Sequence, residues 1–157
     1  MVLIIGYGNT LRRDDGVGPY LAITIQETCG EASVRVVETH QLVPELIDEI
    51  VSPDVTAVLF MDARVATDIC SCQGIPEEVE IREIEAAVSS PSFGHHLDPS
   101  TLLAYARHLN GGHPRAWLIS IPGVDFEYGE GFSEYARRSL TVAEEKVLRL
   151  LHSIFIK

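Results

Sequence analysis

Short apolar runs recur along the chain, separated by segments in which apolar residues fall at helical spacing. Four of these runs predict buried strands of a sheet, at Val2–Ile5, Ser33–Val37, Val55–Met61 and Ala116–Ile121. A fifth run, Glu78–Ile84, alternates polar and apolar residues with a period of two. That alternation predicts a half-exposed strand near the edge of the sheet.

Four other segments carry the pattern of amphipathic helices. We expect helices over Val17–Thr28, Pro44–Val51, Asp98–Leu109 and Ser133–Ile154. The signals at the helix ends agree with this prediction, because Ser133 is a suitable N-cap and the glycines after Asn110 are typical of a helix end.

Strands that alternate with helices predict parallel pairing, since each helix returns the chain to the same end of the sheet. We therefore expect one α/β domain over residues 1–157 with three layers. Its centre is a mostly parallel, five-stranded twisted sheet, flanked by helices on both faces. In such folds the functional groups gather at the carboxyl ends of the strands.

Three side chains capable of binding a metal follow predicted strands, namely Asp15, Asp62 and His95. Because parallel strands end at one edge of the sheet, the topology alone brings these distant segments together. Two carboxylates and an imidazole can bind a divalent transition metal and leave positions open for water or substrate. The sequence thus indicates a metal site at this edge.

The loop after the first strand also has a structural interpretation. Either Asp14 or Asp15 is expected to be the N-cap of the following helix, which leaves the other acid free. Gly8 and Asn9 are interpreted as residues that shape the turn and so support a site.

The other candidates have structural alternatives as well. Asp62 is compatible with a structural role at a strand end, and His95 and His96 are compatible with a solvated loop. His40 follows the second strand, and we interpret it as a residue outside the catalytic set. The hypothesis of a site therefore depends on the joint placement of the acids and the imidazole.

Composition narrows the classes of function. The 157 residues include 12 Lys and Arg against 23 Asp and Glu, which gives a formal net charge of −11. This acidic balance argues against nucleic acid as a partner.

No apolar run approaches the roughly 20 residues of a membrane span, and the N-terminal segment does not resemble a secretory signal. Three cysteines, Cys29, Cys70 and Cys72, are too few and odd in number for a disulfide framework. We therefore expect reduced thiols in a cytoplasmic protein, with an accessory metal or redox role as the alternative.

A dinucleotide-binding loop is the main competing interpretation of the first loop, because Gly6 and Gly8 follow a strand and precede a helix. The third glycine of that fingerprint should fall at position 11, which is Leu11. Asp14 and Asp15 would also place negative charge where a pyrophosphate binds. These features disfavour nucleotide binding.

One motif in the first loop is specific enough to indicate a family. It reads Gly6-x-Gly8-Asn9-x-Leu11-x-x-Asp14-Asp15-Gly16-x-Gly18. This motif resembles the signature of the NiFe-hydrogenase maturation proteases. The resemblance covers nearly the full chain, since it extends to Asp62, His95-x-Leu97, Pro122-Gly123 and the long terminal helix.

The resemblance implies an endopeptidase that removes the C-terminal extension of a hydrogenase large-subunit precursor after nickel insertion. It implies a monomer that acts on the nickel-loaded precursor, with nickel supplied by the substrate and no permanently bound cofactor. The metal-binding and catalytic positions of the family map to Asp15, Asp62 and His95. The stretch Thr39–Glu45 is most similar to the branch that serves bidirectional NAD-linked hydrogenases.

Two departures from the family pattern concern the ligands. The loop acid is Glu in some relatives and Asp15 here, and the histidine is doubled, so His96 is an alternative to His95. The sequence does not decide whether the nucleophile is a metal-bound water or a water activated by an Asp. A further route is polarisation of the scissile carbonyl by the metal. Asp14 either orients the loop or assists as a base. The alternative function is a non-enzymatic nickel-binding or chaperone-like partner of the immature large subunit.

Overall fold

A computed structural model describes residues 1–67, 78–87 and 97–156 of the chain. It contains five strands, β1 (Val2–Tyr7), β2 (Val34–Thr39), β3 (Ala57–Val65), β4 (Glu80–Ile84) and β5 (Arg115–Gly123). The helices are η1 (a 3₁₀ turn, Arg13–Gly16), α1 (Val17–Cys29), α2 (Leu46–Ile50), α3 (Pro99–Asn110) and α4 (Glu134–Phe155). Every predicted strand and helix has a counterpart among these elements.

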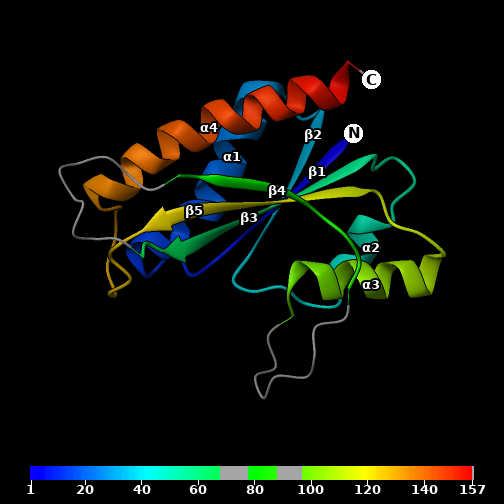
Figure 1. Cartoon of the computed structure of the whole chain (residues 1–157), viewed down its shortest axis with the longest axis horizontal. Coiled ribbons are helices and arrows are strands. Elements are labelled where there is room, and N and C mark those ends of the chain that lie inside the picture. The colour runs from blue at the N-terminus through cyan, green and yellow to red at the C-terminus, as the bar shows by residue number, and fades with distance from the viewer. Residues whose placement is uncertain (68–77, 88–96, 157) are drawn as a thin grey trace.

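The five strands form one sheet in the order β2-β1-β3-β5-β4 (Figure 1). β2, β1, β3 and β5 run parallel, and β4 pairs antiparallel with β5 at the edge. The predicted fold class, a single α/β domain with a mostly parallel five-stranded sheet, is confirmed, as is the edge position of the alternating strand.

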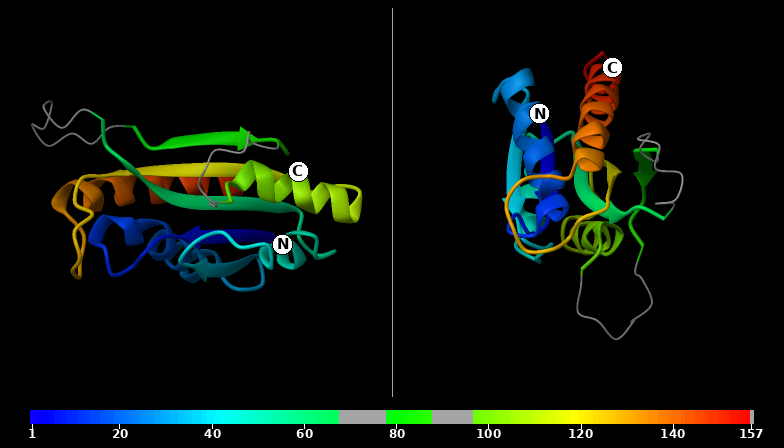
Figure 2. Two further views of the ribbon diagram at one scale, coloured as in Figure 1. Left: turned by 90° about the horizontal axis from the view of Figure 1, so that it is seen from below. Right: turned by 90° about the vertical axis from the view of Figure 1, so that its left-hand side faces the viewer.

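Helices cover both faces of the sheet (Figure 2). On one face α1 and α4 pack over side chains such as Ile4, Leu59 and Ile119. On the other face α2 and α3 pack over Leu3 and Phe60, among others. Adjacent residues of β1 thus enter opposite cores, which is why the predicted run of continuous apolar residues forms a central strand.

The predicted signals at the start of α4 and at the end of α3 are also confirmed. Ser133 is the N-cap of α4, and its hydroxyl accepts a hydrogen bond from Ala136 N at 3.0 Å. Asp98 caps α3 in the same way, through Thr101 N at 2.9 Å. Beyond α3, Gly111 adopts a left-handed conformation with φ of 75°. These caps satisfy backbone groups that a helix cannot satisfy internally.

β3 extends further than its apolar run predicts. The run ends at Met61, but the strand continues through Asp62 to Val65, because β5 supplies partners as far as Gly123. β1 pairs with β3 only as far as Met61. Asp62 therefore lies within a strand rather than directly after one, at the first position of β3 that β1 leaves uncovered.

α1 begins unusually close to the sheet at Gly18. A Cβ atom at this position would lie 2.3 Å from the carbonyl oxygen of Met61. Only glycine allows this approach, which brings the start of α1 against β3 at Met61 and places the preceding turn beside Asp62.

Two further observations bear on the expectations from composition. No helix of the described residues is both long and apolar enough to span a membrane. Cys29 is a free cysteine, as expected, and Cys70 and Cys72 lie outside the described residues.

Candidate functional site

A cavity of about 440 Å³ opens at the carboxyl edge of the sheet. Its lining combines residues from β1, β3 and three loops, and includes Tyr7, Asp15, His40, Asp62 and Asp98. Asp15 and Asp62, two of the three predicted ligands, therefore share one cavity. This is the edge at which the topology of a parallel sheet places functional groups.

Asp15 is held in place by the turn that precedes it. Its Oδ2 atom accepts a hydrogen bond from Asn9 N at 2.9 Å, and the Asn9 side chain accepts one from Leu11 N at 2.9 Å. The Oδ1 atom of Asp15 accepts no hydrogen bond from the described part of the chain. One oxygen of the carboxylate is thus used to fix the side chain, and the other is available to a ligand.

The turn requires glycine at position 8. Gly8 has φ of 144°, and a Cβ atom there would lie 2.0 Å from the carbonyl oxygen of Asp15. A side chain would therefore force Asp15 away from its observed position. The geometry agrees with the interpretation that Gly8 and Asn9 shape the loop.

Asp62 has an environment that disfavours its negative charge. Burial and, to a smaller extent, the nearby charge of Asp15 raise the pKa of its carboxyl group, which lies at about 6. Hydrogen bonds from the Tyr7 hydroxyl and from the backbone of Ala63 act in the opposite direction. Two carboxylates that repel each other in a partly desolvated cavity are a favourable setting for a divalent cation.

Tyr7 was not predicted as a site residue. Its hydroxyl donates a hydrogen bond to Asp62, and its pKa is raised well above the ordinary value by burial, by the charge of Asp62 and by that hydrogen bond. The hydroxyl therefore remains protonated and acts as a donor. The only signal in the sequence is its place at the end of the first strand, between Gly6 and Gly8.

Asp14 points away from the cavity. It is completely buried, and its carboxylate accepts hydrogen bonds from Val124 N, Asp125 N, Ser133 N and Ser133 Oγ at 2.7 to 2.9 Å. Burial alone raises the pKa of Asp14, but these hydrogen bonds outweigh it and hold the pKa below its ordinary range. Asp14 is thus used to fix the chain between β5 and α4.

The predicted N-cap in the first loop is wrong. The 3₁₀ turn η1 runs directly into α1, so the N-cap position falls on Gly16, which has no side chain to cap with. Asp14 and Asp15 instead bond backbone groups elsewhere. The contacts of Asp14 support its role in orienting the loop, and they leave no oxygen free for a general base.

The third predicted ligand, His95, and its alternative, His96, lie outside the described residues. The chain is described again from Leu97, and both Leu97 and Asp98 line the cavity. Within the described ranges, no group of three or more His, Cys, Asp or Glu side chains could hold a metal ion. Two of the three predicted ligands can therefore be placed.

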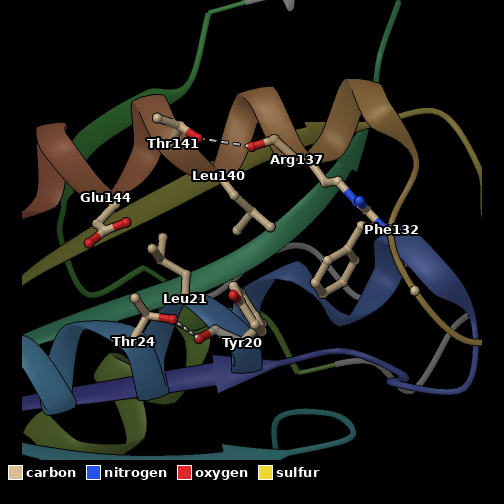
Figure 3. Close-up of a pocket in the computed structure, with 9 residues that line it drawn as sticks. Tyr20, Leu21, Thr24, Phe132, Arg137, Leu140, Thr141 and Glu144 are labelled. Carbon is tan, nitrogen blue, oxygen red and sulfur yellow. Dashed lines mark hydrogen bonds between the residues drawn. The ribbon is translucent and has the colours of Figure 1, made fainter.

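A second cavity, of about 410 Å³, lies between α1 and α4 (Figure 3). Leu21 and Leu140 point toward each other across it. Tyr20 and Phe132 form one wall, with ring centroids 5.1 Å apart in an edge-to-face arrangement. Among the described residues, Glu144 is the one acid that lines this cavity, so the described lining has no pair of carboxylates like that of the first cavity. We take the first cavity as the candidate site.

Comparison of sequences gives no relative for this chain: neither a family model nor a curated protein matches it. Comparison of structures finds solved proteins with a similar fold. The hydrogenase maturating endopeptidase HybD from E. coli matches with a TM-score of 0.72 and 20% identity, over 97% of this chain and 92% of that one.

Two archaeal structures are similar to nearly the same extent. The NiFe hydrogenase maturation protease HybD from Thermococcus kodakarensis has a TM-score of 0.69 and 20% identity, over 96% of this chain and 98% of that one. The maturation protease HycI from Thermococcus kodakarensis KOD1 has a TM-score of 0.68 and 19% identity, over 96% and 92%. At this identity the likeness establishes the fold, which is the fold of hydrogenase maturation endopeptidases.

Proposed function

We propose that this protein is an endopeptidase that removes the C-terminal extension of a NiFe-hydrogenase large-subunit precursor and recognises the nickel already inserted there. The observation that carries the proposal is the pair of carboxylates, Asp15 and Asp62, in one cavity at the carboxyl edge of the sheet. The fold shared with proteases of this kind and the motif of the first loop both support it.

The chemistry of the cavity is suited to a cation that arrives with the substrate. Asp15 and Asp62 each provide oxygen ligands, and His95 is the proposed third ligand. Burial and then repulsion from Asp15 raise the pKa of Asp62, and a divalent cation between the two carboxylates would offset both effects. Nickel in the precursor would therefore bring the scissile bond to the site and hold it there, which is the positional contribution to catalysis.

The partner and setting follow from the same proposal. The chain acts as a monomer in the cytoplasm on the nickel-loaded precursor, and nickel belongs to the substrate. The stretch Thr39–Glu45 supports a hydrogenase of the bidirectional NAD-linked branch as the source of that precursor. His40 and Gln41 of this stretch line the cavity, so the residues that resemble this branch lie where a substrate would contact them.

The test is a cleavage assay with purified components. The protein is mixed with a precursor that retains its C-terminal extension, in nickel-loaded and nickel-free forms, and the mass of the large subunit is followed by mass spectrometry. We expect shortening of the loaded form alone. If the loaded form stays intact, the protein is not the protease; if both forms are cut at the same rate, nickel is not the recognition element.

Matched variants connect the assay to the cavity. Asp15→Asn should reduce processing by at least about a hundredfold, because it removes one anionic ligand while keeping the size of the side chain. Asp48→Asn, an exposed acid on α2, is the control and should process at the wild-type rate. His95→Ala and His96→Ala, compared side by side, identify which imidazole is needed.

A further inference from the structure

Two loops form a rim beside the candidate site, and "rim" here means residues 9–13 together with residues 124–132. The first loop follows β1, and the second connects β5 to α4. Each presents a large apolar side chain to solvent, since Leu11 is 65% exposed and Tyr128 is 77% exposed. Apolar side chains that gather at one exposed place mark contact sites for other molecules.

Hydrogen bonds between the two loops hold the rim rigid. Gly129 N donates to the carbonyl oxygen of Leu11 at 2.9 Å, and Arg12 Nε donates to that of Phe126 at 3.0 Å. The guanidinium of Arg13 lies 3.3 Å from the carboxylate of Asp125. The backbone that carries Leu11 is thus fixed, and so is the backbone at Tyr128, which precedes Gly129. A rigid surface loses less entropy on binding a partner.

Backbone strain is also located in the rim. Arg13 has φ of 41°, and among the described residues it is the one non-glycine residue with positive φ. A conformation of this kind persists only where the surrounding structure enforces it, and such residues cluster at functional sites. Here the enforcing contacts are those between the two loops.

Charges show what kind of partner the rim fits. Its arginines are engaged within the rim, whereas Glu127 and Glu130 are exposed and form no ion pair with another described residue. Tyr128 is therefore flanked by two carboxylates that are available to a partner. The complementary surface is apolar and carries Lys or Arg, which can pair with the carboxylates and pack on the aromatic ring.

The rim is continuous with the candidate site. Asn9 links the two, because its backbone N–H binds the Asp15 carboxylate and its side chain accepts from Leu11 N. Asp14 makes a second link, since it anchors both ends of the 124–132 loop. A protein bound to the rim would therefore lie next to the cavity and in a fixed relation to it.

We propose that the rim is the surface on which the folded large-subunit precursor docks, through an apolar and basic face of that precursor. This inference rests on the proposed function and adds to it a protein-binding surface separate from the metal-binding carboxylates. The rim supplies affinity for the precursor, and Asp15 and Asp62 act on the nickel that the docked precursor presents.

The test compares two double variants of the full chain. Leu11→Ser/Tyr128→Ser removes the apolar side chains of the rim, and Tyr105→Ser/Leu109→Ser removes side chains that are 47% and 71% exposed on α3. Precursor affinity is measured by interferometry on immobilised, nickel-loaded precursor, and cleavage is measured as KM and kcat. We expect the rim variant to raise both Kd and KM about tenfold with kcat within about twofold, and the α3 variant to change neither.

The charge of the rim is tested in the same assay. Glu127→Lys/Glu130→Lys should raise the Kd for the precursor more than the apolar rim variant does. It should also reverse the dependence of binding on salt, because attraction to a basic face becomes repulsion. Unchanged Kd and KM in both rim variants would overturn the inference while leaving the protease intact. Wild-type protein that binds the precursor but never cuts it would overturn the proposed function, and Kd would still decide the role of the rim. Wild-type protein that neither binds nor cuts would overturn both.

Discussion

A hydroxyl and a carboxylate from neighbouring strands determine the charge of the candidate site. The Tyr7 hydroxyl donates a hydrogen bond to Asp62, which lowers the pKa of that carboxyl group. Burial and the charge of Asp15 act in the opposite direction and raise it. In the proposed function Asp62 is a metal ligand and must be ionised to bind, so Tyr7 would act on the metal through Asp62.

Tyr7→Phe should weaken nickel binding while the fold survives. The variant keeps the aromatic ring and loses only the donor to Asp62, so the carboxylate is harder to ionise. We expect a loss of about five- to tenfold in nickel affinity near pH 7, measured by calorimetric titration. Tyr105→Phe, an exposed tyrosine on α3, is the control. Equal affinities in the two variants would show that the hydroxyl does not support the ligand.

Asp62→Asn should make the metal-free protein more stable and leave it inactive. The pKa of Asp62 is raised to about 6 in the folded protein, so its ionisation destabilises the fold increasingly between the unfolded pKa and pH 6, and by a constant amount above pH 6. The variant removes a cost of about 3 kcal/mol at pH 7.5, and the gain should vanish below the unfolded pKa of about 4. Urea unfolding at pH 7.5 and at a pH below about 4 measures this gain in the free energy of unfolding. A variant less stable than wild type at pH 7.5 would contradict the pKa argument.

Single close contacts set how the elements meet. α1 approaches β3 because Gly18 has no side chain, and a Cβ there would lie 2.3 Å from Met61 O. We expect Gly18→Ala to lower the free energy of unfolding by about 3 kcal/mol, since the carbonyl is backbone and cannot move aside. The matched control is Gly112→Ala, where nothing lies within 4 Å. Chemical denaturation of both variants gives the comparison, and similar midpoints would refute the packing argument.

Asp14 joins elements that are far apart in the sequence. Asn in its place presents an amide group to donors from Val124, Asp125 and Ser133, and so loses about 2 to 4 kcal/mol of hydrogen bonding at pH 7. Because the folded pKa of Asp14 is lowered, its contribution is present above the unfolded pKa and is lost as the pH falls through the folded pKa. The difference in unfolding free energy between wild type and Asp14→Asn should therefore shrink below about pH 4. A difference independent of pH would show that the charge of Asp14 is not what holds the loop.

Local patterns along the sequence predicted the fold, whereas contacts between residues far apart in the sequence determined the details of the site. Apolar runs and caps such as Ser133 are local signals, so strands, helices and their order could be predicted. The end of β3 could not, because its last residues owe their pairing to β5 rather than to their own polarity. The partners of Asp14 lie 110 to 119 residues away, beyond any local pattern. Tyr7 lies beside Asp62 because β1 pairs with β3 only as far as Met61, and local sequence does not show where that pairing ends.

The overhang of β3 beyond β1 has a consequence for behaviour on heating. Asp62 lies in a core strand that is paired along β5, so its backbone amide should exchange with deuterium only on global unfolding. The position of Asp15 depends instead on the short turn of Gly8 and Asn9, which can open locally on heating. As temperature rises, the two carboxylates should separate before the sheet melts. Nickel affinity is thus expected to decline several degrees below the midpoint seen by circular dichroism, and coincident transitions would show that the turn is as stable as the sheet. The site would then have a melting temperature of its own, set by one loop.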